Sequence, residues 1–469
     1  MGALEGALVM KGSNVFMIPR SISRSNMIQF WFYSLGYLWL FGQLFSAGVI
    51  QAEQITSTKL ENGLEILVKV DRRAPVAAVM VWYRAGSIDE VTGKTGVAHV
   101  LEHMMFQGTK TIPKGEFAKK IASVGGRSNA FTSSDYTGYF EELHSDELEM
   151  AIRLEADRMS NLIITEEDFE TEVKVVMEER RQRVDDNPSA LMMERMSAVM
   201  YVAHPYRNPI IGWMNDLENL TVDDAVAWYQ DWYSPSNAAL VVSGDVDPAE
   251  VIRLASKYFG AIASKEIPTR RYQSEPRALG EKRVTVKGST TIPTQSVGYR
   301  VPRLENHVTD WEPYALYLLA GVLDGYSAAR LPRSLVNEKR IAVSVSASYD
   351  GLKRGPGGFY VGFSPSPTAS LETLERAWRE ELMAIQSEGV TNDELDRVKA
   401  QVIAGQVYSE DSVLGQASRI GRMWSVGLPE TASATINEKL KEITPDQVKQ
   451  VAIKYLNEDN MTVGVLLPQ

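Results

Sequence analysis

Apolar and polar positions follow regular periods along most of the chain after residue 53. Segments in which β-branched and aromatic residues dominate, or alternate with polar ones, predict strands over residues 64–70, 76–86, 128–143 and 237–247. Apolar residues with helical spacing predict helices over residues 147–162 and 166–184. The mixture of both patterns predicts an α+β fold, in which helices pack against a sheet.

One pattern occurs twice. Residues 221–242 (TVDDAVAWYQDWYSPSNAALVV) align without a gap on residues 444–465 (TPDQVKQVAIKYLNEDNMTVGV). Thr221 aligns with Thr444, and Asn237 aligns with Asn460. Each copy predicts an N-capped helix, a turn and a buried strand at the end of a block of roughly 200 residues. We therefore expect two homologous α+β domains, each an antiparallel-rich sheet packed with helices.

A polar segment separates the two predicted domains. Residues 263–285 lack a clear apolar period and include Pro268 and Pro276, which is typical of a linker. The expected organisation is an N-terminal domain over residues 54–262, this linker, and a C-terminal domain over residues 286–469.

The first 52 residues have a different character. Residues 27–52 carry no charge and follow Arg20 and Arg24, and the segment ends on the small residue Ala52. This order predicts a secretory signal peptide and a periplasmic or secreted protein. The apolar run is long enough to span a bilayer, so an uncleaved membrane anchor is the alternative.

Composition narrows the function. The chain has 469 residues, of which 44% are hydrophobic and 23% are charged, as in ordinary globular proteins. A net charge of −11 argues against a nucleic-acid binder. The chain has no cysteine and only five histidines, so any metal ion must be held by His, Asp and Glu.

The segment GVAHVLEHMMFQGT, residues 96–109, contains His99, Glu102 and His103. On a helix, two histidines four residues apart lie on one face, where both imidazoles can bind one Zn²⁺. Glu102 borders this face and can accept a proton from water, which is the chemistry of the inverted zinc-peptidase order His-x-x-Glu-His. We expect structural or surface roles for the other histidines, His144, His204 and His307.

A catalytic zinc ion needs a third protein ligand. The acidic segment 169–184 (FETEVKVVMEERRQRV) places Glu172 and Glu179 two helical turns apart on one face. Glu178 remains an alternative, because helical spacing alone does not exclude it.

With these motifs, the sequence resembles the pitrilysin/insulinase/mitochondrial processing peptidase family, as a bacterial two-domain member. The resemblance runs from about residue 54 to the C-terminus. It is carried by five groups of residues: His99–His103, Phe106–Thr109, Gly125–Thr132, His204–Gly212 and Ser234–Val246.

The resemblance implies a zinc endopeptidase that cleaves peptides or unfolded segments, with one zinc ion per chain. It implies that Glu179 is the third ligand and that Glu172 supports the ligands. Asn129, Ala130 and Phe131 are implied to form a strand edge that binds substrate. Family members of this length usually form dimers, in which four homologous domains close like a clam shell.

This sequence departs from the family in its C-terminal half. Where members often carry an Arg and, seven residues later, a Tyr that polarise the substrate carbonyl, this chain has Asn337 and Val343. We therefore expect a heterodimer whose second, homologous subunit supplies Arg and Tyr. A homodimer that uses Arg330, Arg333 or Arg340 is one alternative, and a non-catalytic subunit of a processing complex is another.

Overall fold

The computed structural model describes residues 55–271 and 273–469, and two β-sheets organise this part of the chain. The predicted signal or anchor at residues 27–52 lies outside the described residues. Within the described ranges, no helix has the length and apolar character needed to cross a bilayer.

The first sheet has six strands in the order β1-β2-β6-β3-β5-β4. Their bounds are β1 (Ile55–Lys59), β2 (Glu65–Val70), β6 (Ala238–Gly244), β3 (Val76–Tyr83), β5 (Thr137–His144) and β4 (Arg127–Thr132). Strands β2 and β6 are parallel, and the other neighbours are antiparallel. The segment 128–143, predicted as one strand, is a hairpin, because the chain turns between Thr132 and Thr137.

The second sheet repeats this order without a counterpart of β1: β7-β11-β8-β10-β9. Its strands are β7 (Lys282–Gly288), β11 (Met461–Pro468), β8 (Thr294–Val301), β10 (Gly357–Pro365) and β9 (Ala342–Asp350). The parallel pair of this sheet is β7 and β11, which correspond to the parallel pair β2 and β6 of the first sheet. Since β7 begins at Lys282, residues 282–285 belong to this sheet and not to the linker.

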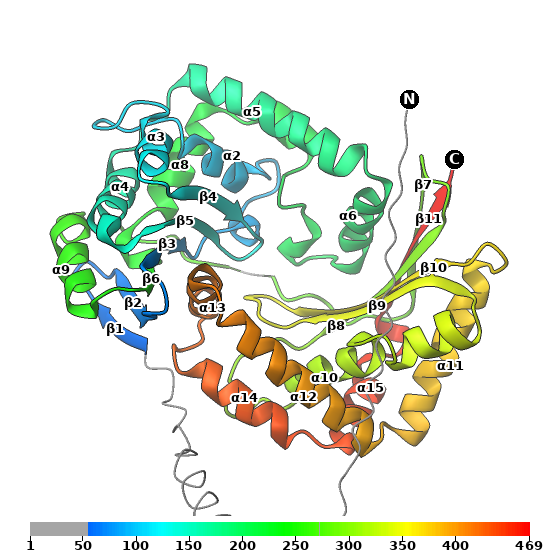
Figure 1. Ribbon diagram of the computed structural model, residues 1–469. Coiled ribbons are helices and arrows are strands. Elements are labelled where there is room, and N and C mark those ends of the chain that lie inside the picture. Colours follow the sequence, from blue (N-terminus) through cyan, green and yellow to red (C-terminus); the bar gives the residue numbers. More distant parts are fainter. Residues whose placement is uncertain (1–54, 272) are drawn as a thin grey trace, which may run out of the picture. The chain divides into compact units, whose positions relative to one another are not determined.

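The helices also repeat in order, except that α3 and α9 have no α-helical counterpart among the described residues of the second half, which confirms the prediction of two homologous α+β halves (Figure 1). The first half has α2 (Val97–Met104), α3 (Glu116–Ser123), α4 (Leu148–Asn161), α5 (Glu166–Arg180), α6 (Pro188–Met200), α7 (Met214–Asn219), α8 (Val222–Trp232) and α9 (Pro248–Phe259). The second half has α10 (Glu312–Asp324), α11 (Leu371–Glu388), α12 (Asn392–Ser409), α13 (Val413–Ser425), α14 (Ala432–Glu442) and α15 (Pro445–Tyr455).

The repeated sequence pattern forms the same local structure twice. Helices α8 and α15 follow Thr221 and Thr444, and each threonine forms a capping box, with Asp224 and Gln447 respectively. Each helix leads through a short 3₁₀ turn into an interior strand of its sheet, β6 or β11.

Helices α6 and α13 hold equivalent places in the order of the two halves, and each packs on the sheet of the other half. Helix α6 packs on β7, β8 and β11, whereas α13 packs on β3 and β6 (Figure 1). Glycines make these contacts close: a Cβ on Gly421 of α13 would lie 2.1 Å from Trp82, and one on Gly298 would lie 2.6 Å from Met196 of α6. The two halves are therefore held together by reciprocal docking of α6 and α13.

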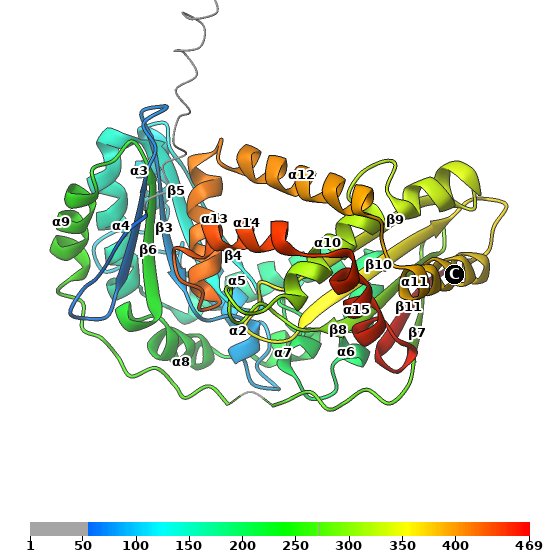
Figure 2. The same ribbon diagram turned by 90° about the horizontal axis from the view of Figure 1, so that it is seen from below.

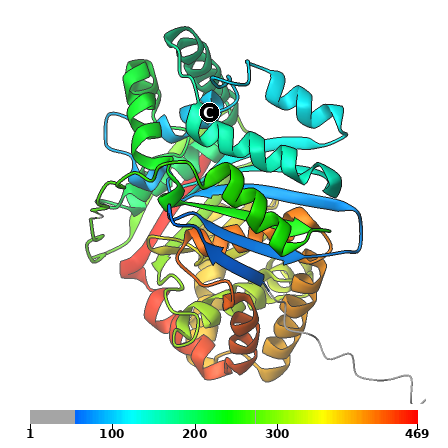
Figure 3. The ribbon, with the colours of Figure 1, turned by 90° about the vertical axis from the view of Figure 1, so that its left-hand side faces the viewer.

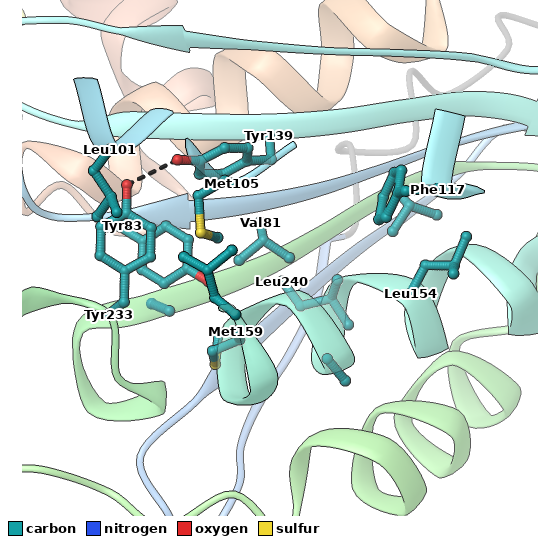
Figure 4. Close-up of a cluster of buried hydrophobic side chains, with 14 of the residues drawn as sticks. Val81, Tyr83, Leu101, Met105, Phe117, Tyr139, Leu154, Met159, Tyr233 and Leu240 are labelled. Carbon is teal, nitrogen blue, oxygen red and sulfur yellow. Dashed lines mark hydrogen bonds between the residues drawn. The ribbon is translucent and has the colours of Figure 1, made fainter. Parts of the chain in front are cut away.

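The other face of the first sheet is covered by its own helices. In Figure 3, α4 and α9 lie next to each other on this side, and α9 crosses the blue strand β2. The buried cluster beneath them includes Tyr83, Tyr139 and Tyr233 (Figure 4). The Tyr139 and Tyr233 hydroxyls are 2.8 Å apart, and the Tyr83 ring stacks on Tyr233, so three phenol rings fill one end of this core.

A long segment without helix or strand connects α9 to β7 and runs along one side of both sheets (Figure 2). Arg270 donates to the side chain of Asn237 and lies over the ring of Trp232. The Glu275 carboxylate accepts hydrogen bonds from the backbone amides of residues 202–204 and pairs with Arg300. The segment is therefore fastened to both halves.

Candidate metal centre

Helix α2 presents the His-x-x-Glu-His motif. Its N-terminus follows Gly96, which has a φ of 90°, and the buried Glu90 carboxylate accepts the backbone N–H groups of Gly96 and Ala98. Burial raises the pKa of Glu90 to about 8. Residues of the opposite face of α2, such as Val100 and Leu101, are buried in the core, so the histidines face away from it.

The two histidine rings lie one turn apart with centroids separated by 5.0 Å. Glu179 reaches them from α5: its Oε2 lies 3.8 Å from His99 Nε2 and 3.5 Å from His103 Nε2. One ligand atom from each of the three residues lies within 4.8 Å of the others. The structure thus brings together the three residues that sequence analysis assigned to the metal.

Glu178, the alternative left open by helical spacing, points elsewhere. Its carboxylate accepts from Arg181 and Gln182 on the solvent side of α5. Buried Val173 and Val176 fix this orientation, because they turn the face with Glu172 and Glu179 toward α2.

Glu172 contacts the His103 ring at Nδ1, the nitrogen that does not face Glu179. Glu172 Oε2 lies 3.0 Å from His103 Nδ1, and Glu172 Oε1 accepts from the Gln107 side-chain amide at 2.8 Å. A carboxylate at Nδ1 favours the tautomer whose Nε2 lone pair is free for a metal ion. Sequence analysis gave Gln107 no role, although its position four residues after His103 was a usable signal.

Glu102 stands beside the ligands and has its own partner. Thr132, the last residue of β4, donates its hydroxyl to Glu102 Oε2 at 2.5 Å. Burial raises the pKa of Glu102 above its ordinary value, which makes the carboxylate a better proton acceptor. Thr132 was part of the sequence motif but was assigned no function, because its contact with α2 arises only in the folded chain.

The electrostatics suit metal binding. Burial, together with the charges of His103 and Arg183, lowers the pKa of His99 to about 3, so its imidazole is neutral at neutral pH. Two imidazole nitrogens and one carboxylate oxygen are the donor set that catalytic Zn²⁺ prefers, with a fourth position left open. The residues present therefore fit a zinc ion.

Strand β4 lies at the edge of the first sheet, next to α2. Asn129 and Ala130 lie on this edge, where Asn129 Oδ1 accepts from the backbone N–H of Ala130. The Phe131 ring packs edge-on against Trp82, with centroids 5.0 Å apart, on the face covered by α13. Phe131 thus packs β4 onto the core, while Asn129 and Ala130 lie on the open edge of the strand.

The corresponding positions of the second half do not carry these ligands. Thr165 and Thr391 precede α5 and α12 and bond Asp168 and Glu394 three residues later, which aligns Glu172 with Val398 and Glu179 with Gly405. Gly321 of α10 faces Val398 just as His103 faces Glu172, so Tyr317 and Ala320 take the places of His99 and Glu102. Among the described residues, the grouping of possible metal ligands occurs in the first half alone.

Comparisons with known proteins agree that the possible metal ligands belong to the first half of the chain. The family model described as insulinase, peptidase family M16, matches residues 65–213, and the model described as peptidase M16 inactive domain matches residues 219–402. The chain belongs to peptidase family M16, which confirms the family inferred from the motifs.

Relatives with similar full length are known. The chain is 34% identical to a protein named zinc protease PqqE of Helicobacter pylori, over 88% of this chain and 92% of the relative. It is 26% identical to the mitochondrial-processing peptidase subunit beta of Lentinula edodes, over 85% and 86% respectively. A solved structure of a protease from Helicobacter pylori has a TM-score of 0.83 and 29% identity, and covers 89% of this chain and 100% of its own.

Proposed function

We propose that this chain is a zinc-dependent endopeptidase that hydrolyses peptides or unfolded polypeptide segments. The observation that carries the proposal is the convergence of His99 and His103 from α2 with Glu179 from α5, with Glu102 beside the two histidines on α2. The proposal is supported by relatives that are named zinc proteases.

In this mechanism, His99, His103 and Glu179 hold the metal, and Glu172 orients His103. Bound zinc would act as a Lewis acid and lower the pKa of water to about 7. Glu102 accepts the proton of the attacking water and passes it to the leaving amine. Thr132 occupies Oε2 of Glu102, which leaves Oε1 to carry the proton.

The substrate would bind as an extra strand. Among the described strands, β4 has a neighbour on one side alone, β5, so the main chain of its other edge, in the segment that contains Asn129 and Ala130, can pair with an extended substrate. Because a substrate must be extended to use this edge, peptides and unfolded segments fit the site better than folded proteins.

A second, homologous subunit would complete the site. Val343 on edge strand β9 has no hydrogen-bond donor in its side chain, and the Asn337 amide can donate but lacks the positive charge of Arg, so the pair supplies neither the hydroxyl of Tyr nor the charge of Arg. Arg330, considered as a substitute, is engaged by both oxygens of Glu394 and by the carbonyl of Gly389. These contacts favour the heterodimer over a homodimer that uses Arg330, whereas Arg333 and Arg340 are exposed and are the remaining candidates for a homodimer.

The place of action is proposed from the sequence alone. The uncharged run at residues 27–52 after two arginines supports export, with the body in the periplasm or secreted, or held at the membrane if the run is not cleaved.

Replacing Glu179 with Gln tests the ligand set. We expect zinc affinity to fall by more than about 100-fold, beyond the 10–100-fold range for residues that act through a ligand, because an amide is a poor zinc ligand. The zinc content of the purified protein and competition with a chelator measure the change in zinc affinity. Glu178→Gln is the matched control and should bind zinc as the unchanged chain does; equal losses in both variants would contradict the assignment.

Purification of the native complex tests the partner. The chain alone should cleave peptides slowly, and a homologous subunit carrying Arg and Tyr should raise kcat by about 10²–10³-fold, the effect expected of a restored oxyanion donor. Activity is followed with a quenched fluorescent peptide. Robust hydrolysis by a homodimer would exclude the heterodimer, and a zinc-loaded complex without hydrolysis would favour the non-catalytic subunit.

A further inference from the structure

The outer oxygen of the candidate ligand Glu179 has a partner of its own. Arg183 Nη1 lies 2.8 Å from Glu179 Oε1, whereas Oε2 is the oxygen that faces His99 and His103. The two carboxylate oxygens are thus divided between a guanidinium and the metal site.

The local backbone explains this contact. Arg183 belongs to a π-helix, Arg181–Asp185, that continues α5, and it follows Glu179 by four residues. An acidic residue four positions before a basic one is the favourable order for an ion pair on a helix. The Glu179 side chain is mostly buried, at 17% exposed, but that of Arg183 is 73% exposed, so the guanidinium stays hydrated while it reaches the carboxylate.

We propose that Arg183 is a positioning residue, which holds Glu179 so that a single oxygen binds the metal. A carboxylate free to rotate can offer both oxygens to a metal ion and fill the position that a catalytic zinc site keeps open. An Arg at Oε1 prevents this and keeps Oε2 directed between the two imidazoles. This inference rests on the zinc site of the proposed function.

Simple charge repulsion predicts the opposite effect, which makes the proposal testable. Because Arg183 Nη1 lies 2.8 Å from the carboxylate of Glu179, its positive charge lies close to the metal position. If repulsion between Arg183 and Zn²⁺ dominated, removal of this charge would tighten zinc binding. If Arg183 positions Glu179, its removal weakens binding.

The experiment measures zinc affinity of the full chain by chelator competition, with the unchanged protein, Arg183→Gln, Arg183→Lys and Arg181→Gln. We expect Arg183→Gln to bind zinc about 10–100-fold more weakly, the range for loss of a partner that orients a ligand. Arg183→Lys should recover most of the affinity, because an ammonium can also donate to Oε1. Arg181→Gln, which loses an equivalent pair with Glu178, should be unchanged.

A second readout, independent of activity, is the visible spectrum of the Co²⁺-substituted protein. Arg183→Gln should show the weaker absorption of a higher coordination number, as Glu179 turns both oxygens to the metal. Unchanged or tighter zinc binding in Arg183→Gln, with zinc bound normally by the unchanged chain, would overturn this inference alone. Failure of the unchanged chain to bind zinc would overturn both this inference and the proposed function.

Discussion

The Glu102→Gln variant should retain zinc and lose peptide hydrolysis by about 10³-fold or more. Gln has nearly the same shape as Glu and can still accept the Thr132 hydroxyl, but its amide cannot take a proton from water. Removal of a positioned proton acceptor typically costs 10²–10⁴-fold in rate. The measurements are kcat with a fluorescent peptide and metal content of the same preparation.

A surface variant such as Glu116→Gln controls for the change of charge, because the partly exposed Glu116 of α3 pairs with Lys119 and lies outside the site. Loss of zinc from Glu102→Gln would contradict the role of Glu102 as a base and make it part of the metal-binding set. Unchanged turnover would exclude Glu102 from proton transfer.

Replacement of Arg158 with Met should lower the free energy of unfolding by about 3–5 kcal/mol, the cost of leaving buried charges without their partner. Arg158 is fully buried on α4, where it pairs with Glu141 and Glu155, both also buried. Its guanidinium lies within 5.2 Å of the centres of the Phe106, Phe117 and Tyr139 rings.

The measurement is denaturant unfolding of the metal-free chain, with Arg153→Met, an exposed residue of the same helix, as the control. Burial already raises the pKa of Glu141, and a carboxyl with a raised pKa in the folded state costs stability as pH rises through that pKa. The loss should therefore be larger at pH 8 than at pH 5. Equal stability of the two Met variants would show that the buried ion group contributes nothing to folding.

The sequence determined much of the fold because local patterns repeat. The aligned segments 221–242 and 444–465 form the same capped helix, turn and strand, since capping boxes and apolar periods act over a few residues. The pattern did not show that α6 and α13 pack on the sheet of the other half. An apolar helix face specifies that it will be buried, but not against which surface.

For the metal site too, the sequence determined some features and the tertiary structure decided others. The sequence alone determined that His99 and His103 share a helix face with Glu102, because four residues span about one helical turn. The choice between Glu178 and Glu179 required the packing of α5 on α2, as two adjacent carboxylates differ by 100° around the helix and only one faces the histidines. The contacts of Thr132 with Glu102 and of Gln107 with Glu172 arise from tertiary structure, because each joins residues far apart in the sequence. The contact of Arg183 with Glu179 is local, across four residues, but only the folded site shows that the other oxygen of Glu179 faces the histidines.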